Sequence, residues 1–77
     1  MVHYLKTEKQ YFDAVVSGEK TFEVRINDRH FEVGDEIYLT NLETNQTIGT
    51  FEITYLFQNG EYGLKKGYCI FSIRRQP

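Results

Sequence analysis

The stretch "GEKTFEVR" at residues 18–25 is the point at which the periodicity of this chain changes from that of a helix to that of a β-strand. From residue 21 onward, polar and apolar residues alternate with the period of two that a strand requires. The alternation separates an apolar face from a polar one: Phe22, Val24 and Ile26 against Thr21, Glu23 and Arg25. We expect the apolar face to pack on the core, so the charge on the other face needs an explanation.

A helix is predicted before this strand. The segment "VHYLK" (2–6) has the composition of a short strand, and residues 7–10 then match a capping box, in which Thr7 and Gln10 each bond the other's backbone N–H. The predicted helix therefore begins near Glu8. Gly18 stands where a left-handed C-cap is expected. The apolar stripe of the helix, which we expect to be core, is Tyr11, Phe12, Val15 and Val16.

The rest of the chain is predicted to form three more strands. They cover residues 36–42, 47–58 and 68–74, with Gly49 marking a bulge or a sharp bend and with a loop at 59–67. No repeat, linker or low-complexity segment interrupts them. We therefore expect residues 1–77 to form a single domain of α+β class, with one helix and about five strands in a strongly bent antiparallel sheet or small β-barrel.

Composition and charge narrow the functional classes. A chain of 77 residues has room for one core, and its formal net charge of −2 argues against a globally basic protein that binds polyanions nonspecifically. Any nucleic-acid site would be a local patch. The single cysteine, Cys69, is expected to be a packed thiol, and the two histidines do not form a recognisable metal set with it. We expect a cytoplasmic monomer with no metal, no cofactor and no membrane association.

The charged face of the predicted strand has two interpretations. In the first, Glu23 and Arg25 form a solvated ion pair on a half-exposed strand, which contributes about 0–1 kcal/mol to stability. In the second, they share a cleft with Lys20, where the cations bind a phosphate or a base edge while the carboxylate orients them. Regular alternation places Lys20 on the side of Phe22, so the second interpretation requires the turn before the strand to bring its amine round.

The pattern G-x-K-x-x-E-x-R, formed here by Gly18, Lys20, Glu23 and Arg25, resembles the signature of ASCH domains in the PUA-like superfamily. The blocks "HYLK" at 3–6, "GEKTFEVRINDRHFEVGD" at 18–35 and "GEYGLKKGYCIFSI" at 60–73 resemble, in order, a small ASCH-like family of bacteria and phages described as domains of unknown function. This resemblance spans nearly the whole chain. It implies a PUA-like β-barrel with a helix at one side and a cleft, lined by the motif, whose expected ligand is RNA or a nucleotide-like molecule.

The same resemblance includes a rival function, because some small ASCH proteins are amidohydrolases that act on acetylated cytidine. Their motif has threonine at the position of Glu23, and a later helical glutamate that this chain lacks. As such an enzyme, this chain would use Lys20, Thr21 and Glu23, with the lysine activating the hydroxyl. A neighbouring carboxylate works against that role because it favours the charged lysine. We expect binding rather than catalysis, and a protein-interaction adaptor is the third alternative.

Residues outside the motif are further candidates for ligand contact. Arg29, in the turn after the strand, either extends the cationic side of the cleft or is simply solvated. His3, at a position that the resembling family also fills with histidine, either lines the cleft or is a structural residue. Near the C-terminus, Tyr62 offers a stacking surface and Lys65 a phosphate partner, a combination typical of proteins that bind single-stranded RNA.

Overall fold

The computed structural model describes residues 1–58 and 60–77. Within them, the chain forms strand β1 (Val2–Thr7), helix α1 (Lys9–Val16), strands β2 (Phe22–Ile26), β3 (Glu36–Asn41) and β4 (Thr47–Gln58), a short 3-10 helix η1 (Glu61–Gly63) and strand β5 (Tyr68–Arg75). The predicted strands and helix are all present, with ends that differ by a residue or so. The predicted 59–67 loop contains η1, and its Asn59 lies outside the described residues.

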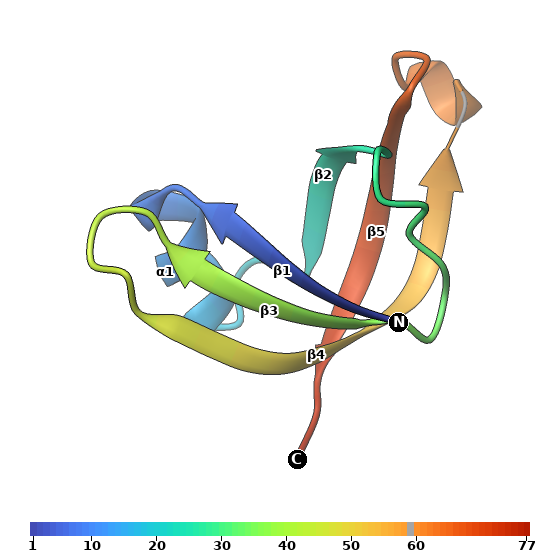
Figure 1. Ribbon diagram of the computed structural model, residues 1–77. Coiled ribbons are helices and arrows are strands. Elements are labelled where there is room, and N and C mark those ends of the chain that lie inside the picture. The colour runs from blue at the N-terminus through green and yellow to red at the C-terminus, as the bar shows by residue number, and fades with distance from the viewer. Residues whose placement is uncertain (59) are drawn as a thin grey trace.

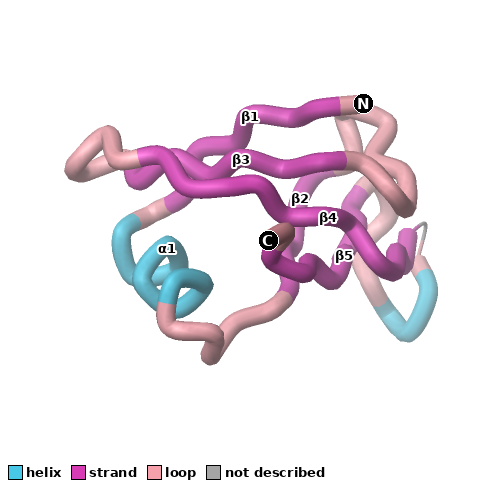
Figure 2. The backbone as a smooth tube through the Cα atoms, turned by 90° about the horizontal axis from the view of Figure 1, so that it is seen from below, coloured by secondary structure: helices cyan, strands magenta, loops and turns pink. Residues whose placement is uncertain are grey.

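The strands form one curled sheet in the order β1-β3-β4-β5-β2. The sheet bends so strongly that β1 and β2, its two edge strands, return toward one another, while α1 and η1 lie at opposite ends of the molecule (Figure 1). The prediction of a small α+β barrel-like fold is confirmed. The prediction of a purely antiparallel sheet is wrong, because β1 pairs with β3 in parallel while the other three pairs are antiparallel. The parallel pair arises because the chain leaves β1 through α1 and β2 before it returns beside β1 (Figure 2).

The core lies inside the curl. Its most deeply buried side chains come from the three inner strands, β3, β4 and β5, with Phe12 and Val15 contributed by α1. The fully buried members are Ile37, Leu39, Ile53, Cys69 and Phe71. The prediction that Cys69 is a packed thiol is thus confirmed, and burial raises the pKa of this thiol despite the opposing effect of the nearby Arg25. No helix of the described residues has the length and apolarity needed to cross a membrane.

Helix α1 differs from its prediction at its first turn. The capping box is wrong: Glu8 is the N-cap and makes no side-chain cap hydrogen bond, while Thr7 ends β1 with its side chain buried. Only the two middle members of the apolar stripe, Phe12 and Val15, face the core, since Tyr11 and Val16 are 44% and 53% exposed. The C-terminal prediction is confirmed, because Gly18 has a φ of 84° and its N–H bonds the carbonyl of Val15.

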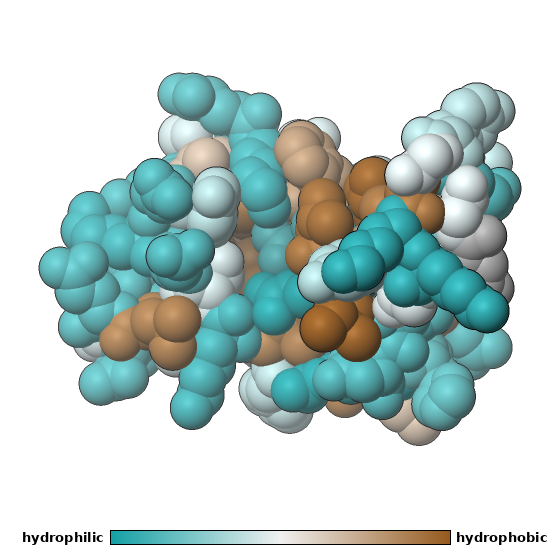
Figure 3. All heavy atoms as spheres, turned by 90° about the horizontal axis from the view of Figure 1, so that it is seen from above, coloured by the Kyte–Doolittle hydropathy of each residue, from teal (hydrophilic) through white to brown (hydrophobic). Residues whose placement is uncertain are grey.

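Strand β2 presents the opposite face to the interior from the one its apolar pattern predicts. Phe22, Val24 and Ile26 are 44%, 49% and 56% exposed, whereas Glu23 is only 3% exposed. The space-filling view shows apolar side chains reaching the surface among hydrophilic ones (Figure 3). The expectation of an apolar face packed on the core is therefore wrong. Its physical reason is that β2 is an edge strand whose inward carboxylate has ionic partners, described below, that stabilise the charge in the interior.

Gly49 lies at an irregularity between β3 and β4, as predicted for a bulge. The register shifts between Ile37 and Leu39, so the two strands do not pair residue for residue around Tyr38. A Cβ atom on Gly49 would lie far inside van der Waals contact with Cδ1 of the Tyr38 ring. A glycine is needed here because the backbone of β4 passes directly over the Tyr38 ring.

Candidate functional site

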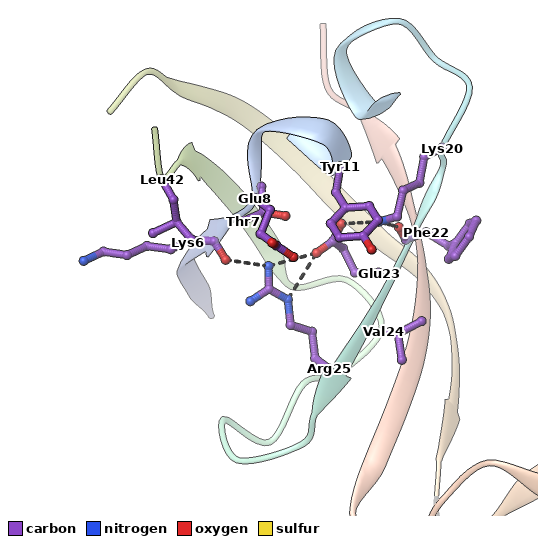
Figure 4. A pocket seen from close by; sticks show the side chains of 10 residues that line it. All are labelled: Lys6, Thr7, Glu8, Tyr11, Lys20, Phe22, Glu23, Val24, Arg25 and Leu42. Atoms are coloured by element: carbon purple, nitrogen blue, oxygen red, sulfur yellow. Dashed lines mark hydrogen bonds and ion pairs between the residues drawn. The ribbon is translucent and has the colours of Figure 1, made fainter. Parts of the chain in front are cut away.

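An open cleft of about 560 Å³ lies where the two sheet edges approach one another at the helix end of the molecule. One side comes from the end of β1 and the start of α1, and the other from β2 (Figure 4). The residues that line the cleft are Lys6, Thr7, Glu8, Tyr11, Lys20, Phe22, Glu23, Val24, Arg25 and Leu42. The structure thus brings together the three charged residues of the motif on one wall of a concave site.

Glu23 is the centre of the charged group. One carboxylate oxygen, Oε2, accepts a hydrogen bond of 2.6 Å from Nζ of Lys20. The other, Oε1, accepts bonds of 3.1 Å from Nε and 2.9 Å from Nη2 of Arg25. With a side chain only 4% exposed, this carboxylate is stabilised by two cations that are themselves mostly buried, at 16% and 22% exposure. This is a buried ionic network, not the solvated surface pair of the first interpretation.

The turn after α1 places Lys20 in this network. Its backbone N–H donates to the carbonyl of Ala14, which holds the chain against the end of the helix immediately after Gly18. From that position the side chain reaches Glu23 and also donates to the backbone carbonyl of Phe22. The turn therefore brings the amine round, as the second interpretation requires.

Two aromatic rings stand beside the Lys20 ammonium. Its Nζ lies 4.9 Å from the ring centroid of Phe22 and 5.8 Å from that of Tyr11, both within the range of a cation–π contact. The helical periodicity assigned Tyr11 to the core, so it was missed as a site residue. The contact between Tyr11 and Lys20 depends on the turn after α1, so the sequence pattern alone does not predict it.

Two arginines bridge the open seam between the sheet edges. Arg25 donates from Nη2 to the carbonyl of Lys6, and Arg29 donates from Nη1 to the carbonyl of Tyr4, each at 3.1 Å. These carbonyls are two residues apart on β1, so both point from the same side of the strand. The arginines thereby satisfy backbone acceptors that an edge strand leaves without a ladder partner.

The chain matches one family model over residues 2–73, described as "Domain of unknown function (DUF3850)". The chain belongs to this family. No significantly similar protein is found among curated proteins. The family match covers the whole of the curled sheet except the last residues of β5, and it includes every residue that lines the cleft.

His3 of this DUF3850 domain lies in the interior and does not line the cleft. Its Nε2 is 2.8 Å from Oδ2 of Asp35, and its ring packs edge-on against Phe31 at a centroid distance of 4.7 Å. Burial opposes ionisation of Asp35, but hydrogen bonds from His3, the chain's amino group and the Glu32 N–H outweigh it and lower the pKa of this carboxyl. Of the two roles predicted for His3, the structure therefore supports the structural one.

The other predicted contact residues lie apart from the cleft. Tyr62, 91% exposed, lines a separate hollow beside β4 and β5, and Lys65 lies over the ring of Tyr68 with its Nζ 5.7 Å from the centroid. Thr21 is exposed and is not among the residues that line the cleft. Arg29 lines a neighbouring hollow. Within residues 1–58 and 60–77, no group of three or more histidine, cysteine or acidic residues is arranged to hold a metal ion.

Proposed function

We propose that this chain is an ASCH-type, PUA-like domain that binds RNA or a nucleotide-like ligand in the cleft beside Glu23. The observation that carries the proposal is the buried network at this position, in which one carboxylate holds Lys20 and Arg25 in fixed positions at the wall of an open cleft. A network of this kind orients cations in advance, so a ligand does not have to order two long side chains when it binds.

The other walls of the cleft suit a planar ring. Tyr11 and Phe22 supply aromatic surfaces, and Leu42 and Val24 supply aliphatic ones. Stacking of a base on aromatic side chains stabilises complexes of unpaired nucleotides by about 1–3 kcal/mol per base. Cations with aromatic and aliphatic walls match a ligand that has both a planar ring and negative charge, which is the chemistry of a nucleotide.

Both oxygens of Glu23 are engaged by the protein's own cations. The carboxylate is therefore assigned the role of positioning Lys20 and Arg25, and it also repels an anionic group placed directly over it. The groups that contact the ligand directly are then the aromatic side chains and those N–H groups of Lys20 and Arg25 that do not bond Glu23.

We favour binding over hydrolysis of an acylated nucleoside because of how Lys20 is held. Its ammonium donates to a carboxylate and to a backbone carbonyl, which is the environment of a charged group and not of a lysine that accepts a proton from a nucleophile. Thr21, the hydroxyl that such a mechanism would use, is not at the cleft wall. Turnover of acylated nucleosides by the unaltered protein would reverse this preference.

The proposal is tested by an NMR titration of the isotope-labelled protein with short single-stranded RNA, duplex RNA and free nucleotides, each at low and physiological salt. The expected result is a set of amide shifts at residues 18–29 and at Tyr11 that persists at physiological salt. Shifts that appear only at low salt, or that spread evenly over the surface, indicate nonspecific charge attraction and contradict the proposal. No shift with any of these ligands contradicts it directly.

A further inference from the structure

A second hollow of about 370 Å³ lies along the seam next to the cleft. It is lined by Leu5, Val24, Arg25, Ile26, Asp28, Arg29, Phe31 and Tyr68. Arg25 and Val24 line both hollows, so the two are adjacent and meet at the Arg25 side chain. A single extended ligand that crosses Arg25 would occupy both.

Arg25 has a donor that the ionic network leaves unused. Its Nε and Nη2 bond Glu23, and Nη2 also bonds the carbonyl of Lys6, whereas Nη1 has no hydrogen-bond partner among the described residues. In the close-up view one terminal nitrogen of this guanidinium has no dashed line and points away from Glu23 and Tyr11 (Figure 4). The free edge of the guanidinium therefore points away from the aromatic side chains of the cleft.

Arg29 adds a second guanidinium to the same hollow. One of its nitrogens, Nη1, bonds the carbonyl of Tyr4, and its Nη2 and Nε have no partner among the described residues. Among the described residues that line this hollow, Asp28 is the only acid, so the charges of Arg25, Arg29 and Asp28 sum to +1. Guanidinium groups present forked N–H donors that match the oxygens of a phosphate. The second hollow has two of them, from Arg25 and Arg29, whereas Arg25 is the one arginine among the described residues that line the cleft.

We propose that the two hollows are two parts of one site for a single-stranded nucleotide, with the base in the cleft against the Tyr11 side chain and its phosphate in the second hollow between Arg25 and Arg29. This inference rests on the proposed function and names its ligand class more closely. The base has to be unpaired, because a base inside a duplex is stacked on its neighbours and cannot lay its face against a side chain of the cleft. The site therefore selects single strands over duplexes and nucleotides over nucleosides.

The test compares calorimetric affinities for the four ribonucleosides, for their 3′- and 5′-monophosphates and for inorganic phosphate. In the unaltered protein, at least one monophosphate is expected to bind on the order of tenfold more tightly than its nucleoside, as a charge-assisted contact of this kind provides. This increment, unlike nucleoside binding itself, should shrink as salt increases.

Two arginine variants separate the parts of the site. Arg29→Ala is expected to remove most of the monophosphate increment, since only Arg25 then faces the phosphate, while nucleoside affinity stays unchanged. Arg29→Lys, which keeps the charge but loses the fork, restores part of the increment. Arg74→Ala is the matched control, because Arg74 is an exposed arginine on β5 that pairs with Glu52 and lines neither hollow. Thermal unfolding of each variant checks that it is folded.

The outcomes distinguish this inference from the proposed function. If nucleosides bind but phosphate adds nothing, or if Arg29→Ala keeps the increment, the two-part site is overturned while ligand binding in the cleft stands. If inorganic phosphate binds as tightly as the monophosphates, the base contributes nothing and the two-part site is likewise overturned. If neither nucleosides, monophosphates nor phosphate bind, both are overturned, and a protein partner becomes the next candidate ligand.

Discussion

Arg25 and Glu23, two residues apart on β2, form a paired contact in which Nε and Nη2 of the arginine donate to the same carboxylate oxygen, at 3.1 and 2.9 Å. Two side chains at positions i and i+2 of a strand point to the same face, so this contact needs no long-range folding beyond the strand itself. What the fold adds is burial of the pair and the approach of Lys20 from the end of the helix. A local sequence motif thereby becomes a buried network.

Replacing the central carboxylate should destabilise the protein strongly. Glu23→Gln removes the charge that compensates Lys20 and Arg25, both mostly buried, and the loss in the free energy of unfolding is expected to be on the order of 3 kcal/mol. Chemical denaturation measures it. Glu19→Gln, on the exposed turn before β2, is the control and should change stability by less than about 0.5 kcal/mol. Equal losses in the two variants would show that the network is not a stabilising feature.

Because the apolar face of β2 is exposed, substitutions on that face should cost little stability, contrary to what its hydrophobic pattern predicts. Ile26 is 56% exposed and Ile53 is fully buried, although both are isoleucines on strands of the same sheet. Ile26→Ala should lower the free energy of unfolding by less than about 1 kcal/mol, whereas Ile53→Ala should lower it by about 2–5 kcal/mol. A loss at Ile26 as large as that at Ile53 would mean that the apolar face of β2 is covered in solution.

These residues also show which parts of the structure could be predicted from sequence. Positions of strands and turns follow from short-range patterns, so β4, the Gly18 cap and the Gly49 irregularity were predicted closely. The direction in which β2 faces depends on whether a buried carboxylate has partners, and one of these comes from outside the strand. The alternation of polar and apolar residues does not show whether the carboxylate has such partners. A strand with one apolar face is therefore usually predicted to turn that face inward.

The candidate site was predictable to a similar extent. Its charged residues belong to one motif, and the spacing of Glu23 and Arg25 placed both on one face of the strand. The same spacing placed Lys20 on the other face, and the turn after α1 brings it to Glu23. Tyr11 was missed because the sequence pattern does not distinguish a helical aromatic that packs from one that borders an opening. Tyr62 and Lys65 were predicted as further ligand contacts from the aromatic and basic residues of their loop, but the long β4 and β5 strands carry this loop to the end of the molecule away from the cleft. The parallel pairing of β1 with β3 likewise depends on how the whole chain folds.

The close approach of Gly49 to Tyr38 predicts a specific packing defect. A methyl group at residue 49 would collide with the Tyr38 ring, so Gly49→Ala should destabilise the protein by about 1–3 kcal/mol. Combining it with Tyr38→Ala should cost less than the sum of the two single variants, because the second change removes the obstacle. Thermal or chemical unfolding of the four proteins in this cycle measures the coupling, and strictly additive losses would contradict a direct clash.

The carboxylate of Asp35 predicts a loss of stability in acid. Its pKa is lowered in the folded protein below the ordinary value of an aspartate, so the unfolded chain binds its proton more readily as the pH falls. The stabilisation is complete above the unfolded pKa and is lost as the pH falls through the folded one. Asp35→Asn should therefore flatten the dependence of unfolding free energy on pH below about pH 4. Asp13→Asn, on the exposed face of α1, is the control, and equal flattening there would contradict this assignment.

Ligand binding should depend on Tyr11 and Arg25 but not on a cation elsewhere. Tyr11→Ala removes one aromatic wall while leaving the ionic network intact, so it should weaken binding of a nucleotide about tenfold or more without a comparable loss of stability. Arg25→Ala should abolish binding, and Arg25→Lys, which keeps a charge beside Glu23, tests whether that loss reflects the site or the fold. Lys9→Ala is the matched control, since Lys9 lies on the exposed face of α1 and, among the described residues, forms an ion pair with Asp13 alone. Titration of each variant with the same nucleotide, followed by NMR, decides between the alternatives: equal weakening by Lys9→Ala and Tyr11→Ala would mean that the ligand is held by general charge and not in the cleft.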